Sequence, residues 1–64
     1  MKRRQLEKHL RKQGCEFVGE GSRHAKWRGP TGRASTVPRH KEIRPGTVRA
    51  VCKQLEVDEP SSLA

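Results

Sequence analysis

Hydrophobic residues recur with a helical spacing near both ends of the chain. Leu6 and Leu10 lie four residues apart in the otherwise polar segment 3–13, which places them on one face of a helix. Gly14 follows, at the position where a left-handed residue commonly ends a helix. After Pro45, a residue suited to a first helical turn, a stripe at i, i+3, i+4 and i+7 consists of Val48, Val51, Cys52 and Leu55. The pattern predicts one helix at each end.

Three short segments between these helices alternate with the period of a β-strand. They are residues 15–18, 24–28 and 34–37, and in each one side of the alternation is apolar or small. Turn residues separate them: glycines and a serine at 19–22, and the run GPTG at 29–32. Pro38, which cannot donate to a strand ladder, closes the third segment. Strands joined by short turns predict an antiparallel meander.

The order helix, three strands, helix predicts an α+β fold of the double-stranded-RNA-binding-domain type. In this α-β-β-β-α fold both helices cover one face of a three-stranded antiparallel sheet, because a sheet this small buries only one side. We expect Phe17, Trp27 and Val37 to supply the sheet's half of the core. The 64 residues are too few for two cores, so residues 1–57 form one predicted domain. Residues 58–64 lack a burying pattern and are expected to be a mobile tail.

The charge of the chain points to a polyanionic partner. Fifteen Lys and Arg against seven Asp and Glu give a net charge of +8, and phosphate contacts supply most nucleic-acid affinity. The alternatives are a basic structural or ribosome-associated protein, or a charged surface that serves only solubility. The sequence shows no signal-peptide pattern and no apolar run of transmembrane length. We therefore expect a cytoplasmic protein without a membrane partner, in which Cys15 and Cys52 are reduced and buried.

His24 is the strongest candidate for chemistry. The alternation places it opposite the apolar Ala25 and Trp27, on the polar face that Lys26 and Arg28 share. An imidazole can exchange protons near neutral pH, and RNA carries its own nucleophile, the 2′-hydroxyl. The alternative is an ordinary exposed strand histidine without catalytic function.

The other candidates are weaker. His40 can contact phosphate or supply a second acid–base group, but a solvated loop histidine is the favoured interpretation. Trp27 can stack on bases, although its place on the apolar strand face favours a role in the core. Cys15, His24, His40 and Cys52 lack the paired spacing of zinc ligands, so we expect no metal and no other cofactor.

Several separated motifs resemble one family. The segments GSRHAKW, residues 21–27, and TVPRHKEIRPGTVRAVCKQLEV, residues 36–57, are similar to the HicA (YcfA-like) mRNA interferase toxins. The step Gln13-Gly14 at the end of the first predicted helix also fits. The resemblance extends from Met1 to about Val57, nearly the whole chain.

This resemblance implies a ribosome-independent endoribonuclease that cuts mRNA without a known metal requirement and is neutralised by a HicB-type antitoxin. His24 matches the family's catalytic histidine, and Gly21 and Ser22 match the turn that presents it. One departure is Arg23, which stands where many relatives carry a first histidine. Another is the stretch Lys2, Arg3 and Arg4, which stands where relatives often carry a Ser or Thr that caps the first helix. Loss of the cap weakens the helix start by about 1 kcal/mol.

Together these observations give one hypothesis and one alternative. In the hypothesis, His24 acts as a general base on the 2′-hydroxyl or as a general acid on the leaving oxygen, and the toxin is a monomer when free. The basic side chains expected to hold the RNA are Arg23, Lys26, Arg28, Arg39, His40 and Lys41. The alternative is a non-catalytic RNA-binding module with the same fold, in which His24 has no chemical function.

Overall fold

The computed structural model describes residues 1–21 and 24–61 and contains two helices and three strands. In chain order these are α1 (Arg3–Lys12), β1 (Glu16–Glu20), β2 (His24–Arg28), β3 (Ala34–Pro38) and α2 (Pro45–Leu55). The strands form one antiparallel sheet in the order β1-β2-β3. The predicted α-β-β-β-α order and antiparallel meander are confirmed.

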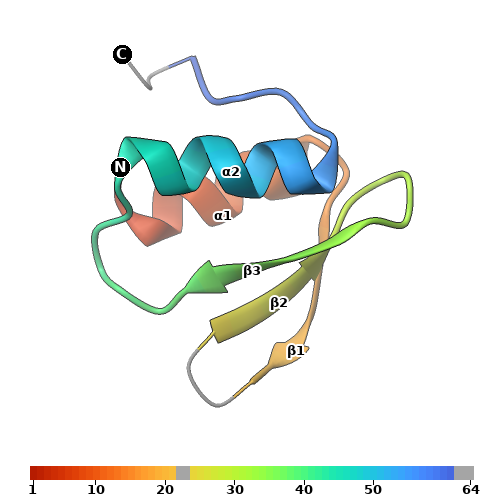
Figure 1. Cartoon of the computed structure of the whole chain (residues 1–64), viewed down its shortest axis with the longest axis horizontal. Helices are drawn as coiled ribbons and strands as arrows, with labels where there is room; N and C mark the ends of the chain where they lie inside the picture. The colour runs from red at the N-terminus through yellow and green to blue at the C-terminus, as the bar shows by residue number, and fades with distance from the viewer. Residues whose placement is uncertain (22–23, 62–64) are drawn as a thin grey trace.

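Both helices lie on the same side of the sheet and run in the same direction (Figure 1). Contacts at the two ends of α1 agree with this direction. At its start, the N–H of Arg3 donates to the carbonyl of Lys41, shortly before α2. Near its end, Nε2 of His9 lies 2.6 Å from the carbonyl oxygen of Asp58, just after α2. The helices therefore form one layer and the sheet a second, and the other face of the sheet is open.

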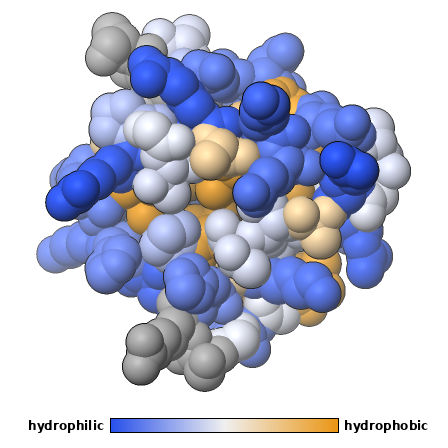
Figure 2. All heavy atoms as spheres, in the orientation of Figure 1, coloured by the Kyte–Doolittle hydropathy of each residue, from blue (hydrophilic) through white to orange (hydrophobic). Residues whose placement is uncertain are grey.

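The core fills the space between the two layers. Trp27 and Val37 from the sheet are fully buried, and they pack in one cluster with the apolar stripes of both helices. The guanidinium carbon of Arg11 lies 5.2 Å from the centre of the Trp27 ring, a cation–π distance. The prediction that Trp27 anchors the core is confirmed. Hydrophilic residues cover most of the face seen in Figure 2, and the most hydrophobic atoms show mainly in gaps between them.

The prediction that Phe17 belongs to the core is wrong. Phe17 pairs with Trp27 across β1 and β2, and their rings meet edge to face at 5.8 Å, yet 47% of Phe17 is exposed. The cause is the position of β1 at the edge of the sheet, where none of its five residues is buried. Figure 1 shows β1 as the strand farthest from the helices. Sequence alternation identifies the face of a residue but not whether a helix covers that face.

The first helix ends as the sequence predicts. Gly14 has φ +88°, a conformation that residues with a Cβ rarely adopt. The N–H of Cys15 donates to the carbonyl of Leu10 at 2.9 Å, and the N–H of Gly14 donates to that of Arg11 at 3.1 Å. These two hydrogen bonds form a Schellman motif, which turns the chain from α1 into β1.

A short backbone pairing that the sequence does not reveal ties the start of α1 to the loop before α2. Lys2 and Glu42 form an isolated antiparallel bridge, and the N–H of Ile43 donates to the carbonyl of Met1 at 2.7 Å. Ile43 is only 2% exposed and joins the core. The segment 39–44, which composition alone describes as a basic loop, is thereby fixed against the helix layer.

The segment after α2 turns back over the helices. Pro60 is buried, and Glu59 lies 3.5 Å from Nε of Arg49 in an exposed ion pair. The expected mobility of residues 58–64 stays a prediction. The last three residues of this segment, 62–64, lie outside the described part of the chain. In that part, neither helix has the length and apolar composition needed to cross a membrane.

Candidate active site on the open face of the sheet

The open face of the sheet carries the polar half of the strand alternation. In β2 the burial pattern alternates strictly: His24, Lys26 and Arg28 are exposed, whereas Ala25 and Trp27 are buried. The prediction that His24 points away from the core is confirmed. The physical reason is local, because successive side chains of a strand must point to opposite faces.

His24 begins β2, and Gly21 directly follows β1. The N–H of Gly21 donates to the carbonyl of His24 at 2.8 Å, so these two residues lie opposite each other. On its other side His24 is paired with Pro38, the last residue of β3. Ser22 and Arg23, predicted as a turn residue and an RNA contact, lie outside the described residues.

A shallow hollow of about 420 Å³ lies beside His24 on the open face. Its walls are formed by β1, the start of β2 and the middle of β3. The described residues that line it are Val18, Gly19, Glu20, Gly21, His24, Lys26 and Thr36. Two of the predicted site residues, His24 and Lys26, are therefore brought together with Gly21 in one concave surface.

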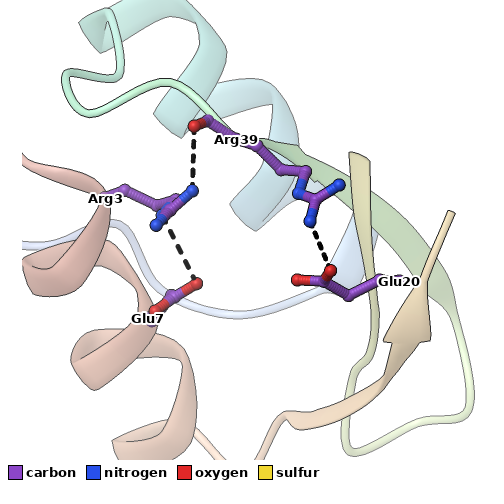
Figure 3. A network of polar contacts seen from close by, with 4 residues as sticks. All are labelled: Arg3, Glu7, Glu20 and Arg39. Atoms are coloured by element: carbon purple, nitrogen blue, oxygen red, sulfur yellow. Dashed lines mark hydrogen bonds and ion pairs between the residues drawn. The ribbon is translucent and has the colours of Figure 1, made fainter. Parts of the chain in front are cut away.

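The segment that follows β3 leaves the sheet at the same end as His24. Figure 3 shows how Arg39 is held there. Its guanidinium forms an ion pair with Glu20 at the end of β1, and its carbonyl accepts a hydrogen bond of 2.8 Å from Nη1 of Arg3. Arg39 thus connects β1, β3 and α1. Part of its charge is balanced by Glu20, but both side chains are exposed and ordinary water competes with the pair.

His40 and Lys41 lie near this end but line two other hollows. His40 lines a hollow formed with Pro38 and residues 42–44 and 47. Lys41 lines a separate one together with Lys2, Arg3 and Arg4 at the start of α1. The predicted basic segment 39–41 therefore extends the positive surface from the sheet toward α1, and His40 does not line the hollow of His24.

Arg28 is at the opposite end of β2 from His24. It lies four residues from His24 along the strand, which corresponds to about 13 Å. Its partners on the neighbouring strands are Glu16 and Ala34. Its Nη1 lies 3.5 Å from the Glu16 carboxylate, and both side chains are exposed. Arg28 is therefore not among the described residues that line the hollow of His24.

The two cysteines lie on the buried side, away from this face. Both are free thiols, and removal from water raises the pKa of each above its ordinary value. For Cys52, the Glu59 carboxylate and Cys15 raise the pKa further. Their burial as small apolar residues is as predicted. Among the described residues, no group of three or more His, Cys, Asp or Glu is placed to hold a metal ion.

The sequence did not indicate four of the residues that line the hollow: Val18, Gly19, Glu20 and Thr36. For Val18 and Gly19, a β-bulge explains this. The pairing of β1 with β2 skips one residue between Phe17 and Gly19, so the simple alternation that the sequence suggests is broken at Val18. The glycines at 19 and 21, both close to His24 in sequence, were the available signal.

Comparison with known proteins identifies the family. A family model described as the HicA toxin of bacterial toxin–antitoxin systems matches residues 3–57. The chain belongs to the HicA toxin family. No curated protein and no solved structure matches it. As a HicA toxin, the chain is the toxin component of a toxin–antitoxin system, in which an antitoxin is the expected partner.

Proposed function

We propose that this HicA toxin is an endoribonuclease that cleaves mRNA with His24 as its catalytic residue. The observation that carries the proposal is the position of His24: exposed at the start of β2, on the open face, in the wall of a hollow that also contains Lys26. The positive charge of the chain supplies the attraction for RNA. Membership of a toxin family supplies the biological context.

The proposed reaction needs one proton removed and one donated. As a general base, the His24 imidazole takes the proton of a 2′-hydroxyl, and the oxygen attacks the adjacent phosphorus. The bond from phosphorus to the 5′-oxygen of the next nucleotide breaks, and that oxygen receives a proton from water or a lysine. The products are a 2′,3′-cyclic phosphate and a 5′-hydroxyl. Alternatively, His24 donates the proton to the leaving oxygen and another group acts as the base.

The basic side chains hold the substrate in this proposal. Lys26 is closest to the site, because it lines the same hollow as His24 and stabilises the charge that develops on the phosphate. Arg39, His40 and Lys41 hold the RNA backbone beyond the end of the sheet, and Arg28 holds it at the far end of β2. A HicB-type antitoxin neutralises the toxin by covering the open face.

Expression of the chain and its variants in bacteria tests the proposal. We expect the wild type to arrest growth with fragmentation of mRNA, and His24→Ala at equal abundance to do neither. His24 is exposed, so its loss should change the free energy of unfolding by no more than about 0.5 kcal/mol. His9→Ala, a histidine of the helix layer, is the matched control and should remain toxic.

The purified protein provides a second measurement. Cleavage of a single-stranded RNA should persist in EDTA, since no metal ion takes part in the proposed reaction. The cut ends should carry 2′,3′-cyclic phosphates, because the 2′-oxygen attacks the phosphorus. If His24→Ala arrests growth as strongly as the wild type, the catalytic proposal fails. That result would favour a non-catalytic RNA-binding module that acts through its basic surface.

A further inference from the structure

The hollow beside His24 has a shape that the proposed reaction does not by itself explain. Val18 forms one of its sides and is 42% exposed, although it is apolar. Because the β-bulge lies between Phe17 and Gly19, Val18 has no partner residue on β2. The result is an apolar surface on the otherwise polar open face.

Gly19 keeps the hollow open. Gly19, Lys26 and Thr36 form one row across the three strands, since Lys26 is paired with both of the others. Neighbouring strands are about 4.8 Å apart, so a side chain at position 19 would stand beside Val18 and Lys26. A Cβ built at Gly19 meets no atom within 4 Å, and the backbone there does not have a positive φ. Neither packing nor backbone conformation therefore requires glycine at this position.

We propose that this hollow binds a nucleobase of single-stranded RNA next to the bond that is cut. The proposal rests on the proposed function and adds the part of the substrate that the hollow recognises. Val18 offers an apolar surface to the flat face of a base. Thr36 offers a hydroxyl group to its edge, because it lines the same hollow. Base edges and faces are accessible in this way only when the RNA is single-stranded.

The distance to His24 supports a base as the occupant. His24 lies two residues from Lys26 along β2, which corresponds to about 7 Å. A base in the row of Gly19 is therefore within one nucleotide of a phosphate held at His24. The size of the hollow, about 420 Å³, falls within the range of pockets that hold small organic ligands.

Filling the hollow tests the proposal. In Gly19→Val, the Cβ meets no atom within 4 Å and the branched side chain extends into the space of the base, so the melting temperature should be at least that of the wild type. Gly46→Ala is the matched control, because a Cβ at Gly46 also meets nothing within 4 Å but lies at the start of α2. Binding is measured by fluorescence anisotropy with a labelled 2′-O-methyl RNA, which the proposed reaction cannot cleave.

A series of these oligonucleotides, each lacking the base at one position, separates base binding from backbone binding. For the wild type and Gly46→Ala, we expect loss of one particular base to weaken binding about tenfold, the change that about 1.4 kcal/mol produces. Gly19→Val should bind the complete oligonucleotide about tenfold more weakly and should be insensitive to loss of that base.

Two results would overturn the inference. One is that Gly19→Val binds the complete oligonucleotide as the wild type does. The other is that both proteins lose the same affinity when the base is removed. If Gly19→Val instead weakens only the complex with the antitoxin, the hollow is a protein-docking surface and not a base site. Because the oligonucleotide cannot be cleaved, these outcomes do not depend on whether His24 is catalytic.

Discussion

At the scale of single residues, the direction in which the His24 side chain points is set by its neighbours in the sequence more than by distant contacts. Ala25 and Trp27 must face the core, so His24 and Lys26 must face the other way. The hydrogen bond from the N–H of Gly21 then holds the carbonyl of His24 in place at the start of β2. A Cβ at Gly21 would lie 3.2 Å from that carbonyl oxygen, which explains why a glycine suits this position.

Gly29 provides a stability prediction at the same scale. A Cβ at this position would overlap the carbonyl oxygen of Leu55 at the end of α2. Because that atom belongs to the helix backbone and cannot move aside, Gly29→Ala should lower the free energy of unfolding by roughly 1–3 kcal/mol. Urea unfolding followed by the fluorescence of the buried Trp27 measures this change.

The control for this prediction is Gly46→Ala in the first turn of α2, where a Cβ meets no atom within 4 Å. It should leave the stability unchanged or raise it by about 0.5 kcal/mol, since alanine has fewer conformations than glycine in the unfolded chain. Equal effects of the two substitutions would contradict the close approach of the turn at residue 29 to α2.

At the scale of elements, the two helices end in the same motif but with different residues. After α1 the left-handed position is Gly14, whereas after α2 it is Glu56, with φ 59°. The N–H of Glu56 donates to the carbonyl of Lys53, and that of Val57 donates to the carbonyl of Cys52. The hydrogen bonds of a Schellman motif are thus made at a position that disfavours a side chain.

Glu56→Gly should therefore stabilise the protein by about 0.5–1 kcal/mol. The substitution also removes the hydrogen bond between Thr31 and Glu56, but both side chains are exposed, so its loss costs little. Thermal unfolding compares Glu56→Gly with Glu56→Ala, which removes the same hydrogen bond and keeps a Cβ. If the alanine variant is as stable as the glycine variant, backbone strain at this position is negligible.

The edge strand β1 shows how an element can differ from its sequence pattern. The alternation predicts a strand over 15–18 with Phe17 in the core, but β1 spans Glu16–Glu20 and Phe17 is half exposed. Pairing with β2 continues past the bulge as far as Glu20, and this pairing is not visible in the alternation of β1 alone. The same bulge creates the apolar side of the hollow at Val18.

At the scale of the whole molecule, the layered arrangement separates stability from chemistry. The helices and one face of the sheet enclose the core, which leaves the other face free for His24 and Lys26. Salt bridges at the rim partly balance Arg28 and Arg39, yet the chain as a whole keeps a charge of +8. At the site, Lys26 and Arg39 supply positive charge beside the Glu20 carboxylate, whereas the thiols are confined to the core.

The two buried thiols predict how stability depends on alkaline pH. Burial raises the pKa of both Cys15 and Cys52 above the ordinary value of 9.0, so the folded chain keeps these protons when the unfolded chain begins to lose them. Their contribution is fully present below about pH 9 and is lost as the pH rises toward the folded-state pKa values. We expect urea midpoints to fall above pH 9.

The double variant Cys15→Ala/Cys52→Ala separates this effect from the titration of lysines. It should be less stable than the wild type at pH 7 because two buried side chains are shortened, but its midpoint should fall less between pH 9 and pH 10. If the urea midpoints of the two proteins fall equally with rising pH, the thiols have the same pKa in the folded and unfolded states.

The sequence by itself determined the order of the elements, the anchor role of Trp27 and the face on which His24 lies. These features follow from periodicities of 2 and 3.6 residues and from turn chemistry, which act within a few neighbouring residues. Only the tertiary structure decided that Phe17 is exposed, that Ile43 joins the core, and that Val18 and Gly19 shape a hollow beside His24. Those features depend on strand register and helix coverage, which arise from contacts between segments far apart in the chain.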